Sequence, residues 1–277
     1  MSALASLLPA ALPSGLATAE LNANVTLNGA QIMAFLLASV RIVAWLMVAP
    51  PFNTRSVPTM AKVVLAVSLA FVVSGTIADD RLPATTPELL LTAFNQVLIG
   101  VAMGFVMQLL FTAVSLAGTL IDNFGQFAMV AAFDPLSMNT NSVFGRLYTW
   151  LATVLLLVSG AHVLIIGGLL KTFEFLPLDG SPDLGSWQTV LMTAFRMLMT
   201  MSLQIALPLM AVFFIADLSL ALLTKVAPAL NAMSIMFPAK IGLTLLLVGA
   251  SFPMLPTVID KLTTYALDAM STMAGAG

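Results

Sequence analysis

The sequence predicts an all-α membrane protein with about six hydrophobic helical elements, several of them interrupted by proline or glycine. Its residues are 60% hydrophobic and only 8% charged, whereas a soluble domain usually carries about 25% charged residues. A composition this poor in charge cannot cover a surface that faces water. In addition, apolar stretches close to the roughly 20 residues that a membrane-spanning helix needs recur along the chain.

The six apolar segments differ in length and regularity. They lie at residues 30–49, 63–78, 89–121, 147–170, 188–216 and 241–259. From Leu89 to Ile121 no residue is charged, and as one continuous helix this stretch would be about 50 Å long at ~1.5 Å per residue. Since the hydrocarbon core of a bilayer is roughly 30 Å thick, we expect this helix to be tilted, broken or projecting beyond the bilayer.

Three parts of the chain are expected. Residues 1–28 contain no lysine or arginine, so they lack the basic start of a secretory signal and are interpreted as a flexible extension, with a cleaved signal as the alternative. Residues 29–267 form the membrane domain and residues 268–277 a C-terminal tail. The loops after the first, third and fifth segments hold most of the basic residues, which the positive-inside tendency would place in the cytoplasm.

The composition argues against several classes of function. There is no cysteine and a single histidine, His162, so thiol chemistry and clustered imidazole metal ligands are not expected. The net charge of −2 offers no basic face for nucleic acid. We therefore expect no metal, no cofactor, no nucleic-acid partner and no enzymatic activity.

Two polar residues within the apolar segments call for an explanation. Arg41 lies near the middle of the first segment, where a charge costs at least ~2.5–3.5 kcal/mol, so it should face a partner or water. Asp122 and Asp217 are possible partners, in an ion pair that serves packing or transport. His162 fits a proton relay poorly because relays need several titratable groups in series, and a hydrogen-bonded packing histidine is favoured.

Small residues and prolines indicate close packing and irregular backbone. Gly100 and Gly104 form a pair that lets helices approach closely in lipid, either within this chain or against another subunit. Prolines 208, 228, 238, 253 and 256 are expected to interrupt the last third of the chain. Non-helical backbone at membrane depth must be covered by protein or line an aqueous cavity.

The stretch at residues 122–142, DNFGQFAMVAAFDPLSMNTNS, combines soft apolar side chains with glycine, and its apolar run ends at a turn-forming pair, Asp134-Pro135. Its bulky members are Phe124, Phe127, Met129 and Phe133, separated by Gly125 and alanines. Methionine adapts to irregular space, and the chain has 18 of them. The stretch therefore suits either a deformable seal over a passage or the filling of a core.

Four segments, in order, resemble the FliR family, a core component of the export gate in the bacterial flagellar type III secretion system. They are RIVAWLMVAPPFNTRSVP from residue 41, GQFAMVAAFDP from residue 125, GAHVLIIGGL from residue 160 and KVAPALNAMSIMFPAK from residue 225. The similarity spans roughly residues 30–265. The resemblance implies FliP/FliQ-like helical hairpins, assembly with FliP and FliQ, contact with FlhB and FlhA, and passage of unfolded substrates through the inner membrane at the flagellar basal body.

The resemblance also implies roles for particular residues. The family's plug corresponds to Asn123–Phe133, with Asp134 and Pro135 as the turn after it. A hairpin from Lys225 to Lys240 would carry subunit packing near the cytoplasmic end, with both lysines in water. Pro228, Asn231 and Pro238 would provide the breaks and contacts of this hairpin.

Two alternatives stay open at this point. The injectisome counterpart of FliR shares the architecture, and a small-molecule permease would also use broken helices around a polar site. No internal repeat is visible, and polar residues within the segments are few, which is unlike a permease. One departure from the family is Ala161, which precedes His162 where relatives have a second histidine.

Overall fold

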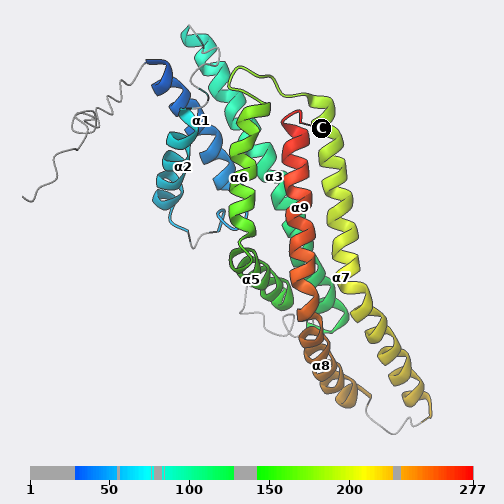
Figure 1. The fold of residues 1–277 in the computed structure, drawn as a ribbon. Helices are drawn as coiled ribbons and strands as arrows, with labels where there is room; N and C mark the ends of the chain where they lie inside the picture. Colours follow the sequence, from blue (N-terminus) through cyan, green and yellow to red (C-terminus); the bar gives the residue numbers. More distant parts are fainter. Residues whose placement is uncertain are drawn as a thin grey trace, which may run out of the picture.

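The computed structural model describes residues 29–54, 57–75, 77, 83, 85–127, 142–226 and 232–276, with residues 232–235 described as backbone only. Across these residues the chain is helical and contains no strand (Figure 1). The prediction of an all-α fold is therefore confirmed. The helices are α1 (Gly29–Val48), α2 (Thr59–Ser74), α3 (Thr86–Phe124), α5 (Val143–Val158), α6 (Ala161–Phe175), α7 (Leu184–Val226), α8 (Ala232–Ser251), the 3₁₀ turn η1 (Phe252–Met254) and α9 (Leu255–Met273).

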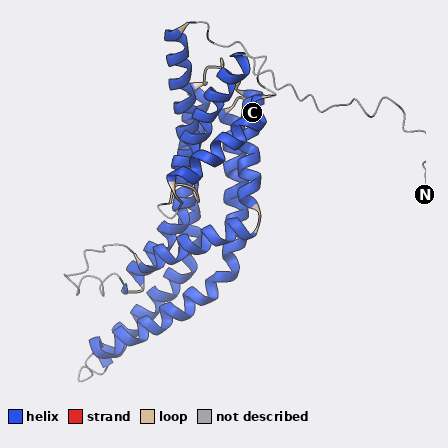
Figure 2. Cartoon of the chain, turned by 90° about the vertical axis from the view of Figure 1, so that its left-hand side faces the viewer, coloured by secondary structure: helices blue, strands red, loops and turns tan. Residues whose placement is uncertain are grey.

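Helix α3 is the central element of the bundle. It packs against α1, α5, α7 and α9, while α2 packs on α1 and α6 on α9. Thr85 starts α3 with a capping box, in which Glu88 accepts the backbone N–H of Thr85 at 3.3 Å. The long helices α3, α7 and α9 run side by side, α5 lies oblique to α6, and α8 with the end of α7 extends beyond the rest of the bundle (Figures 1 and 2).

The expected segments at 30–49, 63–78, 89–121 and 188–216 lie largely on single helices, α1, α2, α3 and α7, whereas the segment at 241–259 spans the end of α8, η1 and the start of α9. By length and composition α1, α3, α7 and the stretch Met236–Met273 are able to cross a membrane, and α5 with α6 forms a bent pair that could count as one more span. Helix α2, with 16 residues, is a shorter apolar helix. The fourth segment is not one helix, however, because α5 and α6 meet at 74°. Gly160 at this bend has φ 75°, a left-handed conformation that glycine adopts without steric cost.

The two longest helices exceed the thickness of a bilayer. With 39 residues in α3 and 43 in α7, they measure about 58 Å and about 64 Å at ~1.5 Å per residue. Only 22% of the most apolar stretch of α7 is buried within the chain. Lipid or other protein must therefore cover most of this helix.

The prolines interrupt the last third of the chain less than the sequence predicts. Pro208 lies inside α7 and Pro238 inside α8, and both helices continue through them. The expected breaks at these two positions are wrong, since a proline removes only one donor and the surrounding turns can retain the helix when neighbouring helices hold it. Pro253 lies in η1 and Pro256 in the first turn of α9, where a missing N–H is harmless. Pro228 is outside the described residues.

Helix α9 runs through the boundary expected at residue 267. Met270, Met273 and Ala274 are buried, and Trp187 in the first turn of α7 donates its Nε1–H to the carbonyl oxygen of Met273 at 3.0 Å. The interpretation of residues 268–277 as a tail is corrected for residues 268–274, because they belong to the packed bundle.

Candidate functional site

The carboxyl end of α3 meets the amino end of α5 through a buried carboxylate. Both side-chain oxygens of Asp122 accept the backbone N–H of Phe144, each at 3.2 Å, and Asp122 is only 2% exposed. The hydroxyl of Ser142 accepts the N–H of Gly145 at 2.7 Å, as an N-cap residue does. These bonds satisfy the donors that a helix start would otherwise leave unpaired.

Two glycines let α3 and α5 touch backbone to backbone. A Cβ added to Gly118 would lie 2.5 Å from the carbonyl oxygen of Phe144 and 2.6 Å from the nitrogen of Gly145. A Cβ added to Gly145 would lie 2.6 Å from the hydroxyl of Ser142 and 2.9 Å from that of Thr119. A side chain at position 118 would therefore force the two backbones apart, whereas one at position 145 would displace the side chains of Ser142 and Thr119.

An aromatic contact joins the chain just beyond the end of α3 to the first turn of α5. The rings of Phe127 and Phe144 pack edge to face with centroids 4.8 Å apart and an interplanar angle of 68°. Gln126, immediately before Phe127, has φ 67°, an uncommon conformation that turns the chain at the end of α3. Residues 128–141 are outside the described part, but the residues on either side of them, at the end of α3 and the start of α5, are in contact.

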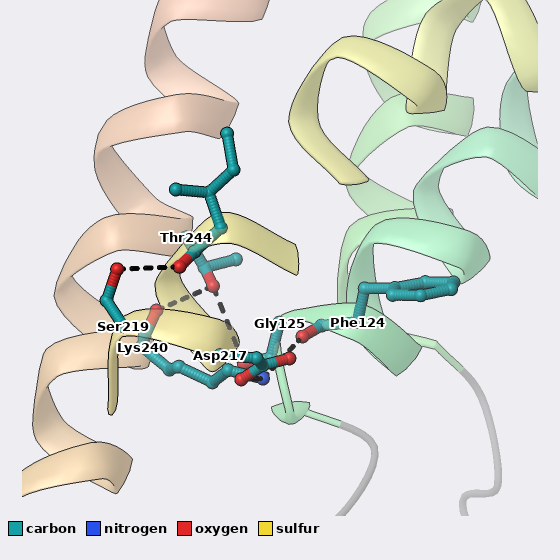
Figure 3. A network of polar contacts seen from close by, with 7 residues as sticks. Phe124, Gly125, Asp217, Ser219, Lys240 and Thr244 are labelled. Carbon is teal, nitrogen blue, oxygen red and sulfur yellow. Dashed lines mark hydrogen bonds and ion pairs between the residues drawn. The ribbon is translucent and has the colours of Figure 1, made fainter. Parts of the chain in front are cut away.

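On its other side, the end of α3 is held by α8 (Figure 3). Lys240 forms an ion pair with Asp217 of α7 at 2.5 Å and donates to the carbonyl oxygen of Phe124 at 3.3 Å. The hydroxyl of Thr244 donates to the carbonyl oxygen of Lys240 at 2.7 Å and lies 3.5 Å from that of Gly125. A cation at a helix carboxyl end is favourable because unpaired carbonyls give that end a partial negative charge.

This geometry corrects the expectation for Lys240. The lysine is 3% exposed and lies between α3 and α7 instead of extending into water. The expectation rested on the length of the side chain alone, whereas the buried ammonium group pairs with the carboxylate of Asp217, whose side chain is 43% exposed. Lys225, at the last turn of α7, is exposed.

The structure describes part of the predicted plug. Phe124 is 40% exposed at the end of α3, Gly125 is buried beneath Thr244, and Phe127 is half-buried against Phe144. The other predicted plug and turn residues, Met129, Phe133, Asp134 and Pro135, lie outside the described residues, as does Asn231 of the hairpin. Their roles stay predictions.

Gly100 and Gly104 face α1 of the same chain. A Cβ on Gly100 would lie 2.4 Å from the carbonyl oxygen of Arg41, and one on Gly104 would lie 3.0 Å from Cβ of Val48. Their predicted role in subunit packing is therefore corrected to packing within the chain, which was the other expectation for this pair.

Arg41 is fully buried and has partners other than the two carboxylates expected. Its Nε donates to the amide oxygen of Gln96 at 2.6 Å, and Nη2 donates to the carbonyl oxygen of Leu176 at 3.0 Å. Its guanidinium group lies 4.1 Å from the ring centroid of Phe173. Asp122 and Asp217 are engaged elsewhere, so Arg41 ties α1 to α3 and to the segment after α6.

His162 forms a hydrogen bond with the backbone close to it in sequence. Its Nδ1 lies 3.3 Å from the carbonyl oxygen of Leu156, across the bend between α5 and α6. No group of three or more histidine, cysteine or acidic residues that could hold a metal occurs within the described ranges. The geometry places His162 as a hydrogen-bonded packing residue.

Sequence reasoning missed Phe144, Thr244 and the pairing of Lys240 with Asp217. For the start of α5 a signal was present, since Ser142 directly precedes an apolar helical run as N-cap residues do. Thr244 carries no local signal, because its contact with Gly125 joins residues distant in the sequence.

Together these features define a class: an all-α membrane protein in which overlong helices meet in a closely packed, hydrogen-bonded junction at the end of α3. The family described as bacterial export proteins, family 1, matches residues 32–266. The chain is 31% identical to the flagellar biosynthetic protein FliR of Escherichia coli (strain K12) over 222 residues, which cover 80% of this chain and 85% of that protein. The FliR of Bacillus subtilis (strain 168) is 25% identical over 243 residues, 87% of this chain and 94% of that protein.

A relative from a secretion system is similar over a shorter range. The secretion system apparatus protein SsaT of Salmonella typhimurium is 31% identical over 161 residues, 57% of this chain and 62% of that protein. The chain belongs to the FliR family of bacterial export proteins.

Proposed function

We propose that this protein is a core subunit of the flagellar type III protein export gate in the inner membrane, at the flagellar basal body. With FliP- and FliQ-like partners it forms a pore for unfolded substrates, and FlhB- and FlhA-like proteins adjoin it. Residues 123–133 act as a plug that seals the pore. Membership of the FliR family supports the export role, and the plug and the partners are the finer part of the proposal.

The observation that carries the plug is the double anchoring of the segment that includes residues 128–141. Asp122, Phe127 and Phe144 hold its two ends together at the end of α3. A loop with fixed, adjacent ends can change its conformation while the helices that carry it stay in place. Apolar side chains on such a loop can exclude water, and hence ions, from a passage and still move aside.

The exposed apolar surface of α7 supports the proposed assembly with partner subunits. Helix α7 exposes a row of large apolar side chains, and its length exceeds what a bilayer can cover. The surface therefore needs other helices, as an assembly with FliP- and FliQ-like subunits would supply. The flagellar system is favoured over an injectisome because the FliR proteins of Escherichia coli and Bacillus subtilis match 80% and 87% of the chain, against 57% for SsaT.

The test compares leakage with assembly. One variant deletes residues 128–133, and a second carries Phe127→Ala with Met129→Ala; Phe71→Ala, on the exposed face of α2, is the control. We expect cells with either plug variant to take up small solutes and ions while FliP- and FliQ-like subunits still co-purify with the chain. Loss of co-purification without leakage would show that these side chains fill a core, and would overturn the proposal.

A further inference from the structure

The junction between α8 and the end of α3 is built from polar groups in an otherwise apolar region. Lys240 contacts two helices at once, the carboxylate of Asp217 on α7 and the carbonyl oxygen of Phe124 on α3. Thr244, one helical turn further along α8, lies against Gly125. The α7–α8 hairpin is thus fastened to the last turn of α3 (Figure 3).

Gly125 packs closely against the side chain of Thr244. A Cβ on Gly125 would lie 2.6 Å from the hydroxyl oxygen and 2.9 Å from the methyl carbon of Thr244. Glycine is needed here for close approach, because its backbone conformation, with φ −77°, is open to any residue. Bulk at position 125 would therefore separate α8 from α3 without removing a single polar group.

We propose that Asp217, Lys240 and Thr244 form a latch that positions the end of α3 against the α7–α8 hairpin, so that movement of the hairpin is transmitted to Phe124 and Phe127. The lysine is the central member, because one ammonium group both pairs with Asp217 and caps the carboxyl end of α3. The three side chains are positioning residues. The effect of the latch on sealing rests on the proposed function of the plug.

Substitutions at positions 217 and 240 distinguish the latch from an ordinary packing contact, because only some of them preserve its hydrogen bonds. Arginine at position 240 can still pair with Asp217 and donate to the carbonyl oxygen of Phe124. The exchange Asp217→Lys with Lys240→Asp restores the pair but places a carboxylate next to that carbonyl, where it cannot donate. If Lys240 acts only by pairing with Asp217, both Lys240→Arg and the charge exchange should restore its function. If Lys240 also caps the carboxyl end of α3, only Lys240→Arg should restore it.

The experiment uses the full chain, co-expressed with its gate partners, and measures small-solute uptake by cells beside co-purification of the partners. We expect Lys240→Met, Thr244→Val and Gly125→Ala to raise uptake severalfold with the complex retained. Lys240→Arg should stay at the wild-type level, and the charge exchange should assemble yet leak. Thr224→Val is the matched control, because Thr224 lies on the same hairpin and its hydroxyl donates to the carbonyl oxygen of Ala221 in its own helix.

Each outcome decides the proposal. Retained complexes without leakage in Lys240→Met and Thr244→Val overturn the latch, as does loss of the complex in both variants, which indicates a purely structural contact. A charge exchange that seals as well as the wild type reduces the role to pairing and also overturns it. If the latch is overturned, the variant lacking residues 128–133 shows which proposal has failed. Leakage in that variant supports the plug and means that only the latch is wrong. Absence of leakage means that the proposed function is wrong.

Discussion

The carboxylate of Asp122 accepts the backbone N–H of Phe144, 22 residues further along the chain, with both of its oxygens at 3.2 Å. This contact closes the segment between α3 and α5 at its base. Asp122→Ala leaves buried donors of α5 without an acceptor, which costs about 1–3 kcal/mol for each such group. We expect a lower unfolding temperature for the purified complex, with a smaller decrease for Asp122→Asn, whose amide oxygen still accepts one bond. Equal decreases for the two variants would mean that the acceptor is not what stabilises this junction.

Close approach at the glycines predicts a graded response to added side chains. Gly118→Ala and Gly100→Ala place a Cβ 2.5 Å and 2.4 Å from backbone oxygens, so two helices must move apart in each variant. Overpacking of this kind typically costs about 1–3 kcal/mol. Gly249→Ala is the matched control, because no atom lies within 4 Å of the added Cβ, and alanine favours a helix by about 1 kcal/mol over glycine.

Thermal unfolding of the purified complex separates these variants. We expect Gly118→Ala and Gly100→Ala to unfold at lower temperature than the wild type, and Gly249→Ala to match or exceed it. A Gly118→Ala protein as stable as the control would contradict the backbone contact between α3 and α5.

The acidic residue before α7 predicts a local dependence on pH. Hydrogen bonds from the side chain and the backbone of Ser186 and from the backbone of Gly185 hold the pKa of Asp183 below its ordinary value of 3.8. Because the folded pKa is the lower one, Asp183 stabilises the start of α7 above the ordinary value and loses this effect as the pH falls through the folded pKa. Below about pH 4 the amides of Gly185 and Ser186 should lose protection from hydrogen exchange, relative to the rest of α7. In Asp183→Ala their protection should be low at every pH, and an unchanged profile would contradict the cap.

The sequence was sufficient for the membrane elements because their signal is local. Spanning helices depend on the length and apolarity of one segment, and the first, second, third and fifth predicted segments each lie largely on one helix. The fourth is divided between α5 and α6, and the sixth spans the end of α8, η1 and the start of α9. The bend at Gly160 was missed for the converse reason: a single glycine in an apolar run is compatible with a continuous helix, and its left-handed conformation becomes visible only in three dimensions.

Partners of particular residues were harder to predict, since they depend on which helices become neighbours. The small-residue pair was correctly read as a point of close approach, but Gly100 and Gly104 lie against α1 and not against another subunit. For Arg41 the candidates were carboxylates, whereas the structure supplies the amide of Gln96 and a backbone carbonyl oxygen. Lys240 was expected in water, whereas its side chain is buried and pairs with the partly exposed Asp217.

Helix α9 gives the last prediction, which concerns the carboxyl end of the chain. Removing residues 268–277 deletes the buried side chains of Met270 and Met273 and the carbonyl oxygen that accepts Nε1–H of Trp187. Burial of a methionine contributes about 1.5–3 kcal/mol, so the truncated chain should unfold at a clearly lower temperature and accumulate poorly. Removing only Gly277 is the control and should have no effect.

Trp187→Phe isolates the hydrogen bond, because it keeps most of the ring packing and leaves the carbonyl oxygen of Met273 unpaired, at a cost of about 1–3 kcal/mol. If the chain lacking residues 268–277 is as abundant and as stable as the control, these residues are a tail and the packing of α9 against α7 does not stabilise the bundle.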